Sequence, residues 1–296
     1  LTKSLNEVEA ITTFLRDEIE VEEVDGIARV RLSRTSPGIE ANAYYFGHPK
    51  WADSWLRHVH RYPELRDRWL AAAGSWDDRV VVDIGCGPGN LFACVGTRPD
   101  VLIGVDVAEG SLRIAKTQGY LPLLADAQDL PFRNAFADLV VLNGSLHHID
   151  DMTAALREGA RLVKPGGYLV TDHDPQRSAW NFRGFGKLLW ELRRPIYRAL
   201  ERGGHSAVGD EGTWALRTEL HHKPGDGVSR EWFLETLEPL GFEVRTYPHS
   251  HRVGAAALDG EMGRPPMQIR IGQLLSGIGS STPAGALSLM CVARRT

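Results

Sequence analysis

The clearest pattern in the chain is an alternation of short apolar runs with helical segments, which begins near residue 79. Apolar runs rich in β-branched residues predict strands buried on both faces, and helical spacing follows three of these runs. An order of strand, helix, strand predicts an α/β fold with a Rossmann-like, doubly wound parallel sheet. The predicted strands are Val80–Ile84, Val101–Val105, Tyr120–Leu124, Asp138–Leu142 and Tyr168–Thr171, and the helices lie near 89–96, 110–117 and 152–163.

The alternation stops and then resumes. Ser229 is a plausible helix N-cap and Gly241 a plausible helix end, so a further helix is predicted between them. Two more strands are predicted at Phe242–Thr246 and Ala286–Val292, and a hairpin around Val24–Gly26. We divide the chain into an N-terminal cap or lid segment (1–75), a ligand-binding core (76–175), a helical lid insertion on the substrate side (176–228) and a segment that completes the core sheet (229–296), with a loop-rich insertion at 248–285.

Composition narrows the class of protein. The chain has 296 residues, of which 43% are hydrophobic and 24% charged, as in ordinary globular proteins. A net charge of -4 gives no general basic field for nucleic acid. Three cysteines without a CxxC pair describe neither a disulfide framework nor structural zinc. The acidic start lacks a signal-peptide pattern, and no apolar run is long enough to span a membrane. These features favour a cytoplasmic enzyme.

The strongest motif is VVVDIGCGPGN, residues 80–90, in which a buried strand enters a glycine loop and then a helix. Gly85, Gly87 and Gly89 permit a tight turn and let a ligand approach bare backbone. Dinucleotide enzymes use a related loop, but they place a glycine where this chain has Asn90. Asp83, two residues before the first glycine, is placed to face a cationic ligand group.

Polar residues end the next three strands of the predicted sheet. Asp106 follows one strand and suits the two hydroxyls of a ribose. Asp126 ends the following strand and suits an adenine amino group, whereas Asn143 ends the strand after that. Because ligands bind at the carboxyl ends of parallel strands near the switch point, we expect these side chains to converge.

The series DIGCGPGN, GVDV, ADAQDLPF, FADLVVLNGSLHH and LVKPGGYLV resembles class I S-adenosylmethionine-dependent methyltransferases, in particular the small-molecule group that includes quinone methyltransferases. The resemblance implies a seven-stranded sheet with an antiparallel last strand. It implies that Asp83 and the Gly85–Gly89 loop hold the methionine moiety, that Asp106 holds the ribose, that Asp126 and Ala127 hold the adenine, and that Asn143 lines the sulfonium side. The predicted cofactor-binding set is completed by Cys86, Asn90, Val107, Gly144 and His148.

Histidines near the strand ends are the candidates for acid–base catalysis. His147 and His173 follow strands whose carboxyl ends face the expected pocket, so either is a possible general base. The alternatives are a structural or cofactor-positioning role for His147 and a pairing of His173 with a neighbouring aspartate. The His58/His60, His221/His222 and His249/His251 pairs lack a carboxylate at matching spacing, so no metal is predicted. Candidate acceptor-binding residues are Tyr44, Tyr45, Trp51 and Trp180.

The predicted function is methyl transfer from S-adenosylmethionine to an apolar or aromatic small molecule, with S-adenosylhomocysteine as product and no nucleic-acid partner. The alternatives are a methyltransferase-fold protein that binds the cofactor without transfer, as a scaffold or cyclase, and a nicotinamide oxidoreductase. Residues 180–202 combine aromatics and leucines with arginines. They form either a helical lid or a basic amphipathic segment that contacts anionic membrane. The oligomeric state is left open.

Overall fold

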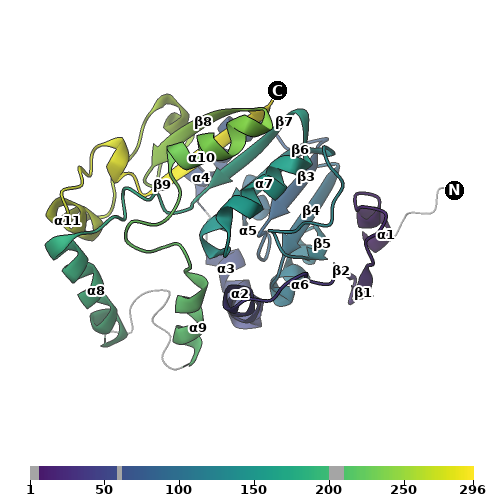
Figure 1. Ribbon diagram of the computed structural model, residues 1–296, viewed down its shortest axis with the longest axis horizontal. Helices are drawn as coiled ribbons and strands as arrows, with labels where there is room; N and C mark the ends of the chain where they lie inside the picture. The colour runs from purple at the N-terminus through teal and green to yellow at the C-terminus, as the bar shows by residue number, and fades with distance from the viewer. Residues whose placement is uncertain (1–6, 59–61, 200–209) are drawn as a thin grey trace.

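The computed structural model describes residues 7–58, 62–199 and 210–296 (Figure 1). It contains a nine-stranded sheet in the order β1-β2-β5-β4-β3-β6-β7-β9-β8. The strands are β1 (Glu22–Val24), β2 (Ile27–Arg29), β3 (Val80–Ile84), β4 (Val101–Asp106), β5 (Leu121–Leu124), β6 (Ala137–Asn143), β7 (Val163–Asp172), β8 (Phe242–His249) and β9 (Ser288–Arg295).

The predicted doubly wound α/β fold is confirmed. Strands β2 to β7 pair in parallel, and β9 runs antiparallel to both β7 and β8. The expected number of seven strands is wrong by two, because the predicted hairpin joins the sheet. Its second strand pairs in parallel with β5, where Ala28 lies opposite Leu123. The hairpin thereby covers an edge that would otherwise leave backbone groups unpaired.

Helices cover both faces of the sheet. They are α1 (Glu7–Thr12), α2 (Pro37–Gly47), α3 (Pro49–His58), α4 (Pro63–Ala73), α5 (Asn90–Val95), α6 (Glu109–Thr117), α7 (Met152–Leu162), α8 (Gly184–Ala199), α9 (Asp210–Thr218), α10 (Arg230–Leu237) and α11 (Met267–Leu275). Val81 and Val82 are both fully buried, but they belong to two different hydrophobic cores. Successive strand residues point to opposite faces, so the apolar run predicted at 80–84 forms part of both cores.

The predicted helix after residue 229 is also present. The side chain of Ser229 accepts a hydrogen bond from the backbone N–H of Trp232, which caps α10. A short 3-10 turn, Glu238–Leu240, follows, and Gly241 ends it with a φ of 83°. A glycine in this left-handed conformation turns the chain directly into β8.

The two described helices of the insertion 176–228 pack against different parts of the molecule (Figure 1). Helix α8 packs against α11, whereas α9 packs against α2. Phe185, Leu188, Leu189 and Leu192 of α8 are exposed. Residues 200–202 and the side chains of 193–199 lie outside the described part of the chain, as do the side chain of His58 and the whole of His60. Among the described helices, none combines the length and the apolar character needed to cross a bilayer.

Candidate functional site

A cleft of about 870 Å³, including its open mouth, lies at the carboxyl ends of β3, β4, β5 and β6. The convergence expected of the polar strand ends is therefore present. The predicted residues that line the cleft are Gly85, Gly87, Asn90, Asp106, Val107, Asp126, Ala127, Asn143, Gly144 and His148.

The glycine loop shapes one wall of the cleft. Gly85 has a φ of 69°, and a Cβ there would lie 2.5 Å from the Cβ of Ser145, so the loop can approach β6 only with glycine. Gly87 has a φ of 51°, and a Cβ there would find only Asn90 Oδ1, at 3.9 Å. Since Gly87 lines the cleft, a side chain at this position would occupy ligand space.

Asp106 is held rigidly at the centre of the cleft. One carboxylate oxygen accepts the backbone N–H of Gly87 and the other that of Ala108, both at 2.8 Å. Burial raises the pKa of Asp106 above its usual value, while these two N–H groups oppose the shift. A carboxylate oxygen has more than one lone pair. Asp106 can therefore still accept from the two hydroxyls of a ribose.

Asp126 also lines the cleft, but its carboxylate has more partners than the sequence suggested. Arg34 Nε donates to one oxygen at 2.7 Å. The backbone N–H and the side-chain amide of Gln128 donate to the other, at 2.9 and 3.0 Å. Asp126 is almost fully buried, whereas Arg34 is partly exposed. Arg34 and Gln128 therefore fix the carboxylate that is predicted to hold the adenine. Gln128 belongs to the motif ADAQDLPF, whereas no motif contains Arg34.

Three residues of the predicted cofactor set do not line the cleft. Asp83 is buried and accepts a hydrogen bond from the Tyr120 hydroxyl at 2.7 Å. Burial raises the pKa of Asp83 to about 7, although the hydrogen bond from Tyr120 acts to lower it. Cys86 is buried, and burial raises the pKa of its thiol well above the usual value. A Cβ at Gly89 would lie 2.8 Å from the Tyr120 ring. Asp83, Cys86 and Gly89 therefore pack behind the glycine loop and do not face the cleft.

The far side of the cleft is apolar and belongs to helices α2 and α3. Its apolar side chains are Ile39, Phe46 and Trp55, and the polar Asn42 lies among them. The predicted acceptor-binding residues do not line this cleft. Tyr44 contacts Trp214, Tyr45 stacks on Trp51, and Trp180 is buried with its indole N–H on the Leu287 carbonyl. The spacing of 39, 42 and 46 is that of one helix face, and this signal would have separated Phe46 from Tyr44 and Tyr45.

His147 and His148 lie in a 3-10 turn, Leu146–His148, which begins three residues after the end of β6. Asp174 Oδ1 lies 2.8 Å from His147 Nδ1 and also accepts the backbone N–H of His147 at 3.0 Å. His148 Nδ1 lies 2.7 Å from the Thr218 carbonyl oxygen. Burial, aided by His147, lowers the pKa of His148 to about 4. The ring of His148 is therefore neutral at pH 7.

Glu219, directly after α9, lies against this histidine pair. Its Oε2 is 3.9 Å from His147 Nε2 and 3.0 Å from His222 Nδ1. Burial opposes ionisation of Glu219, but His222, His148 and His147 together hold its pKa well below the usual range. Sequence reasoning missed Glu219, because 72 residues separate it from His147.

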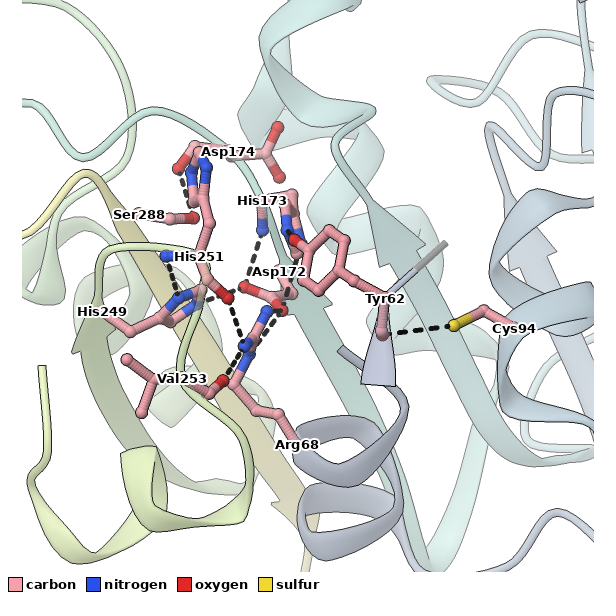
Figure 2. Close-up of polar contacts among 10 residues, drawn as sticks. All are labelled: Tyr62, Arg68, Cys94, Asp172, His173, Asp174, His249, His251, Val253 and Ser288. Atoms are coloured by element: carbon pink, nitrogen blue, oxygen red, sulfur yellow. Dashed lines mark hydrogen bonds and ion pairs between the residues drawn. The ribbon is translucent and has the colours of Figure 1, made fainter. Parts of the chain in front are cut away.

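His173 lies in a second polar cluster (Figure 2). Its Nε2 is 2.5 Å from the Tyr62 hydroxyl and its Nδ1 is 3.2 Å from Asp172 Oδ2. Asp172 also contacts Arg68 and His249. His173 does not line the cleft, and burial lowers its pKa despite the neighbouring Asp172. The structure therefore shows the predicted alternative, in which His173 pairs with a neighbouring aspartate. A catalytic role for His173 stays a prediction.

Comparisons with known proteins identify the family of the chain. Residues 82–171 match the family model described as "Methyltransferase domain". Over 161 residues the chain is 30% identical to the ubiquinone biosynthesis O-methyltransferase of Stutzerimonas stutzeri (strain A1501), a match that covers 49% of this chain and 68% of that protein. It is 34% identical over 132 residues to the 27-O-demethylrifamycin SV methyltransferase of Amycolatopsis mediterranei (strain S699), covering 42% of this chain and 48% of that protein.

Among solved structures, geranyl diphosphate C-methyltransferase from Streptomyces coelicolor A3(2) has the same fold. Its TM-score is 0.50 at 13% identity, over 89% of this chain and all of that one. The alignment with another ubiquinone biosynthesis O-methyltransferase, from Paracidovorax citrulli (strain AAC00-1), spans little more than half of that relative's length, 55%.

The glycine loop, the rigid Asp106 and the family match together define the class of protein. The chain belongs to the class I S-adenosylmethionine-dependent methyltransferases. S-adenosylmethionine is its cofactor, and the residues of the cleft fit it. Gly87 leaves room where a Cβ would intrude, and Asp106 and Asp126 present carboxylates to the cleft, as the resemblance predicts for ribose and adenine binding.

Proposed function

We propose that this methyltransferase transfers the methyl group to an oxygen atom of an apolar or aromatic small molecule. The observation that carries the proposal is the composition of the cleft. A single cavity joins the cofactor residues Asp106 and Asn143 to the apolar side chains of Phe46 and Trp55. The O-methyltransferase names of the relatives support oxygen as the acceptor atom.

In this proposal the two sides of the cleft have different tasks. Asp106 and the loop at Gly87 bind and orient the cofactor, which supplies an electrophilic methyl group when bound. Phe46 and Trp55 bind a flat apolar acceptor and exclude water from the reacting atoms. Because the leaving group is already good, most of the acceleration comes from holding the two reactants in line.

The acceptor hydroxyl must lose its proton during transfer. His147 and His148 are the groups of the proposed site that can handle this proton, since His148 lines the cleft and Asp174 orients His147. General-base catalysis contributes about 10²–10⁴-fold. His147→Ala is therefore expected to lower the rate by that factor while the affinity for the cofactor stays unchanged.

The test is a turnover assay with purified protein. S-adenosylmethionine is incubated with phenols and hydroxyquinones, with matched aromatic amines, and with carbon nucleophiles. S-adenosylhomocysteine and the methylated product are quantified together by mass spectrometry, and Asp106→Ala serves as the inactive control. Product from the hydroxyl compounds alone supports the proposal. Product from the amines alone would refute oxygen as acceptor, and tight cofactor binding without any turnover would favour the non-transferring alternative.

A further inference from the structure

Three potential metal ligands from separate parts of the chain meet beside the cleft. His147 and His148 follow β6, whereas Glu219 follows α9 in the insertion. One ligand atom from each of the three lies within 4.8 Å of the other two. Tetrahedral bonds of 2.0–2.2 Å place ligand atoms about 3.3 Å apart. The 3.9 Å between His147 Nε2 and Glu219 Oε2 exceeds that spacing by only about half an ångström.

Both histidines have the supporting contacts that metal-binding histidines need. His148 Nδ1 contacts the Thr218 carbonyl, which can only accept a hydrogen bond. His148 Nδ1 therefore carries the proton, and in the neutral ring Nε2 carries a lone pair. His147 Nδ1 is likewise held by the Asp174 carboxylate. A ligating histidine whose second nitrogen donates to a carboxylate or carbonyl is the usual arrangement around a bound metal.

The second histidine cluster, around Asp172, is not suited to bind a metal ion. His173 and His249 both lie against Asp172, but the Arg68 guanidinium also donates to that carboxylate (Figure 2). A fixed positive charge at that point repels a metal ion. The His147 group contains carboxylates and imidazoles without an arginine among the contacts described above.

We propose that His147, His148 and Glu219 bind a divalent first-row transition metal, with zinc as the reference ion. Two imidazoles and one carboxylate suit zinc, iron, cobalt or nickel better than magnesium, which prefers oxygen ligands. Three protein ligands leave at least one coordination position for an exogenous oxygen, as in catalytic zinc sites. Since His148 lines the cleft, the metal lies beside it.

The metal would activate the hydroxyl group of the methyl acceptor. This role of the metal rests on the proposed function. When bound, the metal replaces His147 and His148 in handling the acceptor proton, because their free nitrogens are then its ligands. An acceptor hydroxyl that coordinates the metal releases its proton to solvent and becomes a bound alkoxide or phenolate. This oxygen forms the new O–CH₃ bond as the C–S bond breaks, and the electron pair of that bond stays on sulfur. The substrates expected are therefore hydroxyl compounds with a second oxygen placed to chelate, such as catechols.

The test measures metal binding directly. Chelator-treated protein is titrated with ZnCl₂, and separately with MgCl₂, by calorimetry, and cobalt is added to follow its visible bands. We expect one equivalent of zinc or cobalt and far weaker magnesium binding. Glu219→Gln and His147→Asn are each expected to lower zinc affinity by about 100-fold or more, and Asp174→Asn by about 10–100-fold. Glu40→Gln, an exposed carboxylate on α2, is the matched control and should bind zinc normally.

Binding of S-adenosylhomocysteine reports whether each variant is folded, because neither Glu219 nor His147 lines the cofactor cleft. The absence of stoichiometric zinc or cobalt binding to the parent would overturn the proposal. Unchanged zinc affinity in folded Glu219→Gln or His147→Asn would do the same. Methyl transfer by protein that binds no metal refutes this inference and leaves the proposed function standing. Specific zinc binding without turnover on any acceptor supports the metal site and refutes the proposed function.

Discussion

The buried ion pair between Arg68 and Asp172 is expected to dominate the stability of the joint between α4 and the sheet. Both side chains are fully buried, and Arg68 Nε and Nη2 donate to the same Asp172 oxygen at 3.0 and 2.9 Å. Arg68 Nη1 also donates to the carbonyls of His251 and Val253 (Figure 2). Arg68→Met removes the guanidinium but keeps most of the volume, and it leaves a buried carboxylate and two carbonyls without this donor.

Breaking one partner of a buried ion pair costs about 3–5 kcal/mol. For a chain of 296 residues that corresponds to a fall in Tm of about 5–8 °C. Arg66→Met on the same helix is the matched control. Arg66 is exposed and makes one bond, to the Val95 carbonyl at 3.2 Å, so its loss should cost at most about 1 kcal/mol.

The effect should depend on pH. Burial opposes ionisation of Asp172, but Arg68, followed by His249 and His173, holds its pKa well below the usual range. In the parent this lowered pKa adds stability that is present above the unfolded value of about 3.9 and is lost as the pH falls through the folded value. Without Arg68, burial raises the pKa instead. Protonation then relieves the buried charge, and Arg68→Met should be less destabilising at pH 5 than at pH 7.

The assay is urea unfolding of the parent, Arg68→Met, Asp172→Asn and the double variant. We expect the double variant to be several kcal/mol more stable than the sum of the single effects requires, because the two groups are in direct contact. If Arg68→Met and Arg66→Met unfold at the same urea concentration, or if the cycle is additive, the reasoning is wrong.

Three further predictions concern the cofactor and the surface. Asp106→Ala should weaken binding of S-adenosylmethionine at least tenfold by calorimetry, since each bond to a charged acceptor contributes about 1.5–3 kcal/mol, and normal affinity would contradict the ribose assignment. Gly87→Val should abolish cofactor binding, and a folded variant with parental affinity would contradict the role of the loop. If residues 180–202 bind anionic membrane, the protein should sediment with anionic vesicles at low salt but not at high salt. Phe185→Glu should weaken that binding, because Phe185 is 74% exposed, and no sedimentation at low salt would exclude the membrane role.

The central part of the fold could be predicted because its signals are local. A strand buried on both faces is a run of consecutive apolar residues, and the glycine loop is a fixed spacing of three glycines within five positions. The cofactor side of the cleft follows from these, since strand ends in a parallel sheet must meet. The hairpin was visible too, but pairing of β2 with β5 joins positions about 95 residues apart, and no local pattern encodes that contact.

The acceptor side of the cleft could not be predicted in the same way. Helical spacing groups Phe46 with Ile39 and Asn42 rather than with Tyr44 or Tyr45, but only the direction of α2 relative to the sheet decides which helix face lines the cleft. Arg34 and Glu219 are single charged residues in unremarkable surroundings, and each meets its partner only after distant segments pack. The absence of a metal was predicted from histidine spacing along the chain. That criterion does not detect ligands from separate elements.

The three residues after Thr171 show how one strand end can serve two clusters, and they lead to a last prediction. Asp172 faces Arg68, whereas Asp174 faces His147. His173 joins them with a φ of 65°, a conformation that non-glycine residues rarely adopt, and its ring lies against Tyr62 and Asp172. His173→Asn keeps a residue that tolerates this φ, so the variant tests the imidazole alone. The ring of His173 lies against Tyr62 and Asp172, which do not line the cleft, whereas the ring of His147 packs on that of His148, which does. We therefore expect His173→Asn to lower Tm but to change the turnover rate by no more than about threefold, while His147→Ala does the reverse. If His173→Asn instead slows turnover by a factor of about 100 or more at unchanged Tm, His173 is the general base.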